Sequence, residues 1–327
     1  MKRAILILLI VVAASASALV LQSTPPPIRI WGPPAMRGIA ERWTEAYRSR
    51  HPDANFEIVM KGSGTAIPGL YGGQADIALM GRTNDIVDDN GFTRTMERNF
   101  TRIEVASGSV STPGKSDAIA ILVSSSNPLK RLTLDQLDST VNCGRSNVAR
   151  TWGELGLTGA WADKPVKIYG YDMASRTGLY FQQVVTRKGR RMCWDRVAEF
   201  ADARRLDGTH VDASDRVGEA AARDPFALAI ANPAQTRHGL KLVAIGAGDD
   251  AALPTEAEIV ARRYPLARRA YAFVDRKPGS PLDPRIADFL QFVLSAEGQA
   301  LLAADRGYLP LDRANAVAQA RILGESD

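Results

Sequence analysis

Short apolar runs recur along the chain, each bounded by glycine, proline or charged residues. Runs of this length predict strands that are buried on both faces of a sheet. They lie at residues 28–31, 56–60, 75–80, 118–123, 166–170, 226–231 and 270–274. After the first run, Ile39, Trp43 and Tyr47 recur every four residues and predict a helix with one apolar face. Strands that alternate with helices predict an α/β fold with mostly parallel sheets.

The C-terminal part of the chain carries the helical pattern. Two closing helices are predicted, over residues 283–294 and 295–307. Residues 202–224 are charged and are also predicted to be helical. No tandem repeat interrupts these elements.

The N-terminus has a composition of its own. Met1, Lys2 and Arg3 precede an apolar run over residues 4–12, and small residues follow through residue 18. This pattern predicts a secretory signal peptide over residues 1–18. An uncleaved anchor stays open as the alternative, because apolar residues continue to position 21. Residues 19–27 contain three successive prolines and predict a stiff spacer.

Charge limits the partners of the exported chain. The formal net charge is +5, and removal of Lys2 and Arg3 leaves +3 (5 − 2 = 3). So small a net positive charge does not indicate a nucleic-acid partner, but it suits a protein that binds small anions. About 300 residues remain after the signal peptide, which is enough for two lobes rather than one.

The two cysteines, Cys143 and Cys193, belong to no C-x-x-C pair and to no metal-ligand spacing. In an exported protein they predict a disulfide, with two buried free thiols as the alternative.

The most glycine-rich stretch predicts an anion-binding turn. Ser63, Gly64 and Thr65 lie between a predicted strand and a short helix. The stretch lacks the Lys-Ser or Lys-Thr of a nucleotide-binding P-loop and the third glycine of a dinucleotide fingerprint. Backbone N–H groups and two hydroxyls would still form a donor nest for an anion. A capping turn without a ligand is the alternative.

A second turn of the same kind strengthens this interpretation. Ser175, Arg176 and Thr177 also lie between a predicted strand and a helix, and they include a cation. Two helix N-termini from different lobes could share one tetrahedral oxyanion, since each oxygen would accept donors from a different side.

Catalytic chemistry has little support. The three histidines, His51, His210 and His238, lie in unrelated contexts, and no Ser–His–Asp pattern is present. A hydrolase that used Ser63 or Ser175 would lack a base. No metal-ligand spacing is present, so the sequence predicts a binding protein without a metal or cofactor.

Four segments resemble the periplasmic phosphate-binding proteins of phosphate ABC transporters, within the type II solute-binding superfamily. They read KGSGTAIPGLYGGQADIALMGR, SDAIAILVSSSNPLKRLTLDQL, DPFALAIANPAQ and DFLQFVLSAEGQALLAADRGYLPL. The resemblance covers roughly residues 28–312. It implies a two-lobed fold with two hinge segments, near residues 115–118 and 262–266. The first lobe would comprise residues 28–116 and 263–327, and the second residues 117–262.

The resemblance also implies a phosphate site and partners. Ser63 and Gly64 match the first glycine-serine loop, and Ser175 and Thr177 match a turn of the second lobe. Thr65, Arg82 and Arg176 complete the expected ligand set. Arg82 could instead brace its loop, and Arg176 could point to solvent. The implied protein is a periplasmic monomer that delivers phosphate to an inner-membrane ABC permease.

The sequence departs from the family pattern at several positions. Arg176 replaces a glycine, and Tyr171 stands where the family usually has an arginine. Residues 33–36 read Pro-Pro-Ala-Met where the family presents hydroxyls. Asp172 is the nearest candidate for a carboxylate that accepts the phosphate proton, although an aspartate in a surface turn is an equal reading. Because of these departures, an alternative interpretation stays open. In it, the chain is a regulatory or surface module that has lost tight phosphate binding or binds another anion.

Overall fold

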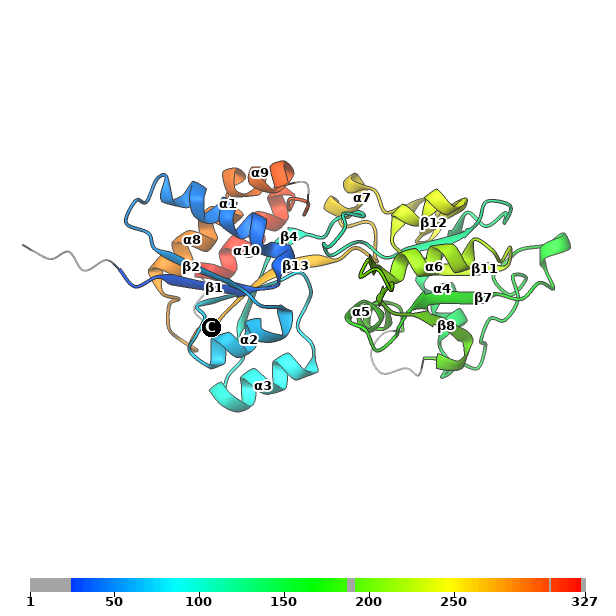
Figure 1. Cartoon of the computed structure of the whole chain (residues 1–327), viewed down its shortest axis with the longest axis horizontal. Helices are drawn as coiled ribbons and strands as arrows, with labels where there is room; N and C mark the ends of the chain where they lie inside the picture. The colour runs from blue at the N-terminus through cyan, green and yellow to red at the C-terminus, as the bar shows by residue number, and fades with distance from the viewer. Residues whose placement is uncertain (1–24, 187–191, 306, 325–327) are drawn as a thin grey trace, which may run out of the picture.

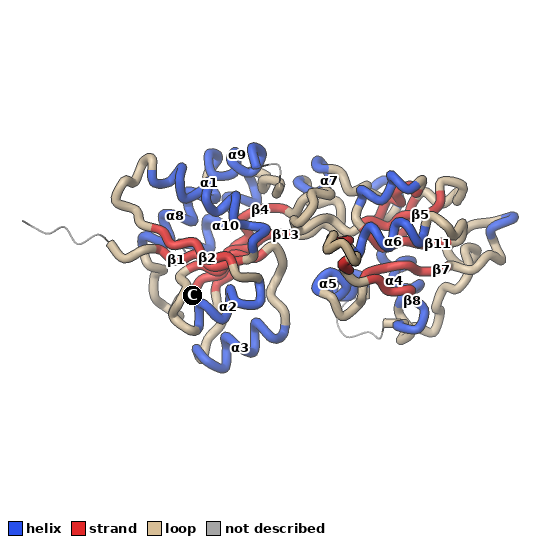
Figure 2. The backbone as a smooth tube through the Cα atoms, viewed as in Figure 1, coloured by secondary structure: helices blue, strands red, loops and turns tan. Residues whose placement is uncertain are grey.

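The computed structural model describes residues 25–186, 192–305 and 307–324. The predicted signal peptide and most of the spacer lie outside the described residues. The chain forms two lobes, and each has a sheet at its centre with helices on both sides (Figures 1 and 2). None of the helices in the described ranges is long and apolar enough to cross a membrane.

The first lobe is built on a five-stranded sheet in the order β2-β1-β3-β13-β4. Its strands are β1 (Ile28–Gly32), β2 (Phe56–Met60), β3 (Ile77–Met80), β4 (Thr101–Ser107) and β13 (Arg269–Val274). The helices α1 (Arg37–Arg48), α8 (Pro284–Leu294), α9 (Ala296–Asp305) and α10 (Arg313–Gly324) cover one face. The helices α2 (Ser63–Tyr71) and α3 (Ile86–Met96) cover the other. Because both faces are buried, β3 is apolar at all four positions.

The second lobe is built on a six-stranded sheet in the order β6-β12-β5-β11-β7-β8. Its strands are β5 (Ala120–Ser124), β6 (Arg131–Leu132), β7 (Lys167–Tyr171), β8 (Val197–Phe200), β11 (Ala227–Ala231) and β12 (Leu240–Ile245). The helices are α4 (Leu134–Val141), α5 (Arg176–Val185), α6 (Ala213–Ala221) and α7 (Glu256–Val260). In β11, Leu228 and Ile230 face the larger core, whereas the alanines face α6. Small side chains on that face let the helix pack closely against the sheet.

The predicted two-lobed α/β fold is confirmed, and both sheets are mixed. In the first, β2, β1 and β3 are parallel, while β13 runs antiparallel to both of its neighbours. In the second, β11, β7 and β8 are parallel, while β5 runs antiparallel to β11 and β12. The antiparallel strands β13 and β5 follow the crossings between lobes, so each enters its sheet from the hinge rather than through a local helical crossover.

Two details differ from the sequence prediction. A third closing helix, α10, follows the two that were predicted. Its turns are rich in alanine and polar residues, so its apolar stripe is weak. Residues 202–224 are not a single helix, because the hairpin of β9 (Ala203–Arg204) and β10 (His210–Val211) precedes α6.

The chain passes between the lobes twice, from β4 to β5 and from α7 to β13. The two crossings contact each other, because the hydroxyl of Tyr264 donates to the carbonyl of Ile119 at 2.7 Å. The second crossing is also tied to the first lobe, where Glu104 accepts from Arg262 at 2.9 Å and from Arg269 at 3.0 Å.

A disulfide joins Cys143 to Cys193 within the second lobe, with the two Cα atoms 5.0 Å apart. It links the end of α4 to the segment that leads into β8. The N–H of Cys193 donates to the carbonyl of Val141 at 2.8 Å, which holds the two segments together beside the bridge.

Candidate functional site

A cleft between the lobes gathers positive charge. It is lined by the loop before α3 from the first lobe, by α5 from the second, and by one residue of the second crossing. The lining residues are Arg82, Thr83, Asn84, Asp85, Arg176, Leu179, Tyr180, Gln183 and Arg268. Three arginines and one carboxylate therefore face the same space, which favours an anionic ligand.

Arg82 is braced within the first lobe. Its side chain is buried, and it forms a two-pronged ion pair with Asp88, with nitrogen–oxygen distances of 2.5 and 3.2 Å. Asp88 also accepts from the backbone N–H of Asp85, which closes the capping box of α3. The Nε atom of Arg82 is buried and has no hydrogen-bond partner among the described residues. The predicted bracing role thus accounts for one side of the guanidinium and leaves a donor on the other.

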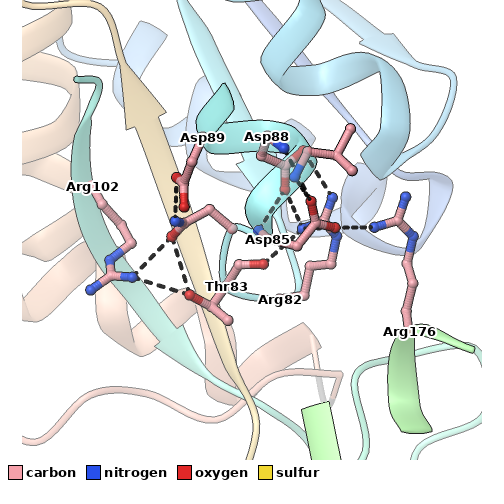
Figure 3. Close-up of polar contacts among 9 residues, drawn as sticks. Arg82, Thr83, Asp85, Asp88, Asp89, Arg102 and Arg176 are labelled. Carbon is pink, nitrogen blue, oxygen red and sulfur yellow. Dashed lines mark hydrogen bonds and ion pairs between the residues drawn. The ribbon is translucent and has the colours of Figure 1, made fainter. Parts of the chain in front are cut away.

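Arg176 reaches from α5 across the cleft to the first lobe. Its Nη1 atom lies 3.2 Å from Oδ2 of Asp85, and the side chain is 50% exposed (Figure 3). Its Nη2 atom lies 3.6 Å from the position that a Cβ on Gly64 would take. The two turns that the sequence singled out therefore face each other across the cleft.

Arg268 is the residue that sequence reasoning missed. It belongs to the second crossing, and its Nη1 donates to the hydroxyl of Thr177 at 2.9 Å. Its guanidinium stacks over the ring of Tyr180, with 5.2 Å between its carbon and the ring centroid. Burial lowers the pKa of Arg268, and its Nε has no partner among the described residues. No described carboxylate lies within ion-pair distance of it, and the charge of the buried Asp117 acts on it only from farther away.

Arg268 also lies close enough to Tyr171 for the two to interact electrostatically. Tyr171 is buried and stands where the resemblance leads one to expect an arginine. A cation is thus present in this part of the site, but it comes from a segment almost a hundred positions later in the chain.

The residues of the glycine-rich turn differ in whether their hydrogen-bond donors are free for a ligand. Ser63 is the first residue of α2, and no described residue hydrogen-bonds to its hydroxyl. Thr65 donates both its N–H and its hydroxyl to the carbonyl of Gly62, at 3.1 and 2.9 Å. The Thr65 donors are therefore occupied within the turn. Ser63 and the exposed Gly64 remain accessible, although neither lines the cleft that the arginines form.

The turn of the second lobe is built around a helix cap. The hydroxyl of Ser175 accepts from the N–H of Gly178 at 3.1 Å, which caps α5. A Cβ on Gly178 would lie 2.4 Å from the carbonyl oxygen of Asp172, so only glycine fits this close approach. Asp172 accepts from the N–H of Ala174 at 2.9 Å and so braces its own turn. The cap and the close packing fix the backbone that carries Arg176 and Thr177.

A buried carboxylate lies at the first crossing. Asp117 accepts from the hydroxyl of Ser109 and from Nδ2 of Asn232, the latter at 3.1 Å. Burial, with a further contribution from the charge of Asp212, raises the pKa of Asp117 to about 6. This carboxylate joins the crossing to Asn232, the residue directly after β11 of the second lobe, and is a structural part of the hinge.

The described residues contain no group of three or more His, Cys, Asp or Glu side chains that could hold a metal ion. The cleft offers guanidinium, hydroxyl and backbone donors instead. This donor set matches an oxyanion rather than a cation.

A model of the PBP superfamily domain matches residues 14–297. The phosphate-binding protein PstS of Pseudomonas aeruginosa is 32% identical over 286 residues, which are 86% of this chain and 81% of that protein. Two solved structures share the fold at lower identity. PstS from Borrelia burgdorferi has a TM-score of 0.60 at 17% identity, over 87% of this chain and 98% of that one. An ABC-type phosphate transport receptor from Vibrio cholerae has a TM-score of 0.54 at 18% identity, over 86% and 99%.

Proposed function

The chain belongs to the PBP superfamily, in the family of phosphate-binding proteins of ABC transporters, and we propose that it captures inorganic phosphate between its lobes for import. Proteins of this family bind and release their ligand without a reaction, so the chain is a binding protein and not an enzyme. The lobes would close on the ligand about the two crossings, as hinged binding proteins do.

One observation carries the choice of ligand class. Arg268 is buried in the cleft wall, keeps an unpartnered Nε and has no carboxylate at ion-pair distance among the described residues. A desolvated cation is costly unless an opposite charge pairs with it, so the site is most stable when an anion is present. Arg82 and Arg176 on the other sides of the cleft support a ligand with more than one oxygen.

Each predicted ligand residue has a role in this proposal. Ser63 and Gly64 present the N-terminus of α2, and Thr65 fixes that turn through its bonds to Gly62, while Ser175 and Thr177 present the N-terminus of α5. Arg82, Arg176 and Arg268 supply the charge. The two helix N-termini would contribute backbone donors from opposite lobes once the cleft closes.

The proposal includes the setting in which the protein acts. The chain would work as a periplasmic monomer, exported by its N-terminal signal peptide, and would deliver phosphate to an inner-membrane ABC permease. No nucleic acid takes part.

A second candidate keeps the fold but not the transport role. In the first loop, Pro33 and Pro34 lack N–H donors, and the carbonyl of Ala35 accepts from Nζ of Lys115 at 2.7 Å. This loop is tied to the first crossing and offers few donors to a ligand. A regulatory or surface module with weak anion binding would tolerate such a loop.

Calorimetric titration with phosphate, sulfate and molybdate tests the choice between the two. We expect micromolar or tighter phosphate binding, with weaker binding of the other two oxyanions. Millimolar affinity for all three would favour the regulatory module. Tight binding of sulfate or molybdate alone would contradict phosphate as the ligand.

The contribution of Arg176 is a separate prediction. Arg176→Ala is expected to weaken phosphate binding about tenfold, because it removes a charge-assisted hydrogen bond. Ser63→Ala removes one neutral donor and should cost less, and Arg82→Ala should also cost less because Arg82 is already paired with Asp88. The measurement is the phosphate dissociation constant of the three variants. An unchanged constant for Arg176→Ala would show that its side chain serves only its contact with Asp85.

A further inference from the structure

Asp85 is a carboxylate inside a cleft that otherwise favours anions. It is the N-cap of α3, and its Oδ1 accepts from the N–H groups of Val87 and Asp88 at 2.9 and 3.0 Å. These two bonds fix the carboxylate on the helix start, so its orientation does not depend on the second lobe. The other oxygen, Oδ2, is free to point across the cleft.

That second oxygen contacts two of the three cleft arginines. It lies 3.2 Å from Nη1 of Arg176 and 3.5 Å from Nη1 of Arg82 (Figure 3). Burial raises the pKa of Asp85, but the backbone bonds from Asp88 and Val87 and the charges of Arg82 and Arg176 outweigh it, so the pKa is lowered overall. The carboxylate therefore stays ionised at neutral pH.

The Asp85–Arg176 pair joins the two lobes outside the crossings. Among the described ion pairs, it is the one that connects a helix start of the first lobe to a helix of the second. Other bonds near the cleft tie α5 to the second crossing instead, such as the hydroxyl of Tyr180 with the carbonyl of Ala267 at 2.5 Å. The contact therefore spans the part of the cleft that must rearrange when a ligand enters.

We infer that Asp85 is a built-in counter-anion, which holds Arg176 across the empty cleft and is replaced there by the bound oxyanion. The inference rests on the proposed function for the identity of the ligand. Asp85 occupies one of the cations that an oxyanion needs, so it lowers the affinity for every oxyanion. In the empty protein it keeps Arg176 directed into the cleft and limits how far the lobes separate.

Asp85→Asn tests this role without removing the helix cap, because asparagine caps helices as well as aspartate does. Asp89→Asn is the matched control. It removes the same charge from the first turns of α3, but Asp89 contacts Asn84 at 2.6 Å and lies on the side of Arg102 in Figure 3.

The first measurement needs no ligand. Spin labels at Asn90→Cys in α3 and Glu219→Cys in α6 report the distance between the lobes, since both positions are exposed. In anion-free protein, Asp85→Asn should broaden the distance distribution toward longer values, whereas Asp89→Asn should not. An unchanged distribution for Asp85→Asn would overturn the inference, whether or not the protein binds phosphate.

The second measurement compares phosphate with sulfate by calorimetry at neutral pH. A partly exposed ion pair contributes modestly, so Asp85→Asn should lower both dissociation constants by about two- to fivefold, and Asp89→Asn should leave them unchanged. Weaker phosphate binding with tighter sulfate binding would overturn the inference, because Asp85 would then accept the proton that only phosphate carries. If the wild type binds neither anion, the proposed function fails. The role of the Asp85–Arg176 contact in holding the lobes together is then tested by the interlobe distances alone.

Discussion

Replacing Arg268 by methionine is expected to raise the phosphate dissociation constant by about tenfold to a hundredfold, which corresponds to the loss of a charge-assisted hydrogen bond in a desolvated site. Arg268 is only 8% exposed and lacks a carboxylate at ion-pair distance among the described residues. Its interaction with an anion is therefore less screened by water than that of the half-exposed Arg176. Isothermal titration of Arg268→Met with phosphate measures the effect.

Although Arg268→Met should bind phosphate more weakly, it should not lose thermal stability. Methionine keeps an unbranched side chain on the ring of Tyr180 and removes a buried charge, so the melting temperature should stay the same or rise. Arg269→Met is the matched control, because Arg269 pairs with Glu104 on the sheet and Glu104 keeps Arg262 as a partner. An Arg268→Met variant that binds phosphate like the wild type would contradict the role of Arg268. A large loss of stability would show that the guanidinium serves packing instead.

The difference between Arg268 and Arg269 explains why the sequence did not reveal that Arg268 lines the cleft. Arg268 and Arg269 are adjacent, and an extended chain sends adjacent side chains to opposite sides. One reaches Glu104 in the first lobe and the other reaches Thr177 in the second. The available signal was a pair of cations directly before a buried strand at a predicted hinge. Which of the two faces the cleft depends on how the crossing packs, and no local pattern specifies that.

Local chemistry accounts for the parts of the site that the sequence did predict. The two turns with Ser63 and Ser175 were found because a strand end, a glycine and a hydroxyl lie within a few positions of each other. The capping box of Asp85 and Asp88 is equally local. The contact of Asp85 with Arg176 is not, since it joins positions 91 residues apart. Sequence patterns locate such groups one by one, and only the folded arrangement of the lobes pairs them.

The same distinction applies to the fold. In β11, leucine and isoleucine alternate with alanine, and every position is buried, so the strand could be predicted from composition alone. Helix α10 buries only Ala316 and Leu323, and its remaining turns look like a solvated segment. It is held by α8, which precedes it by one helix, and by β4, which lies far away in sequence. An element that depends on distant partners more than on its own pattern is the kind that sequence reasoning misses.

Removal of the disulfide is expected to destabilise the second lobe by roughly 4 kcal/mol, because Cys143 and Cys193 close a loop over a separation of 50 residues and the bridge restricts the unfolded chain. The double variant Cys143→Ala with Cys193→Ala avoids a stray thiol, and urea unfolding followed by tryptophan fluorescence measures the change. Reduced wild type should unfold at the same lowered urea concentration as the double variant, while a reductant should leave the double variant unaffected.

Thiol titration of unfolded, unreduced wild type should find no free cysteine. Two titratable thiols, or a double variant as stable as the wild type, would contradict the bridge as a source of stability. The bridge lies away from the cleft residues, so phosphate binding by the folded double variant should match that of the wild type.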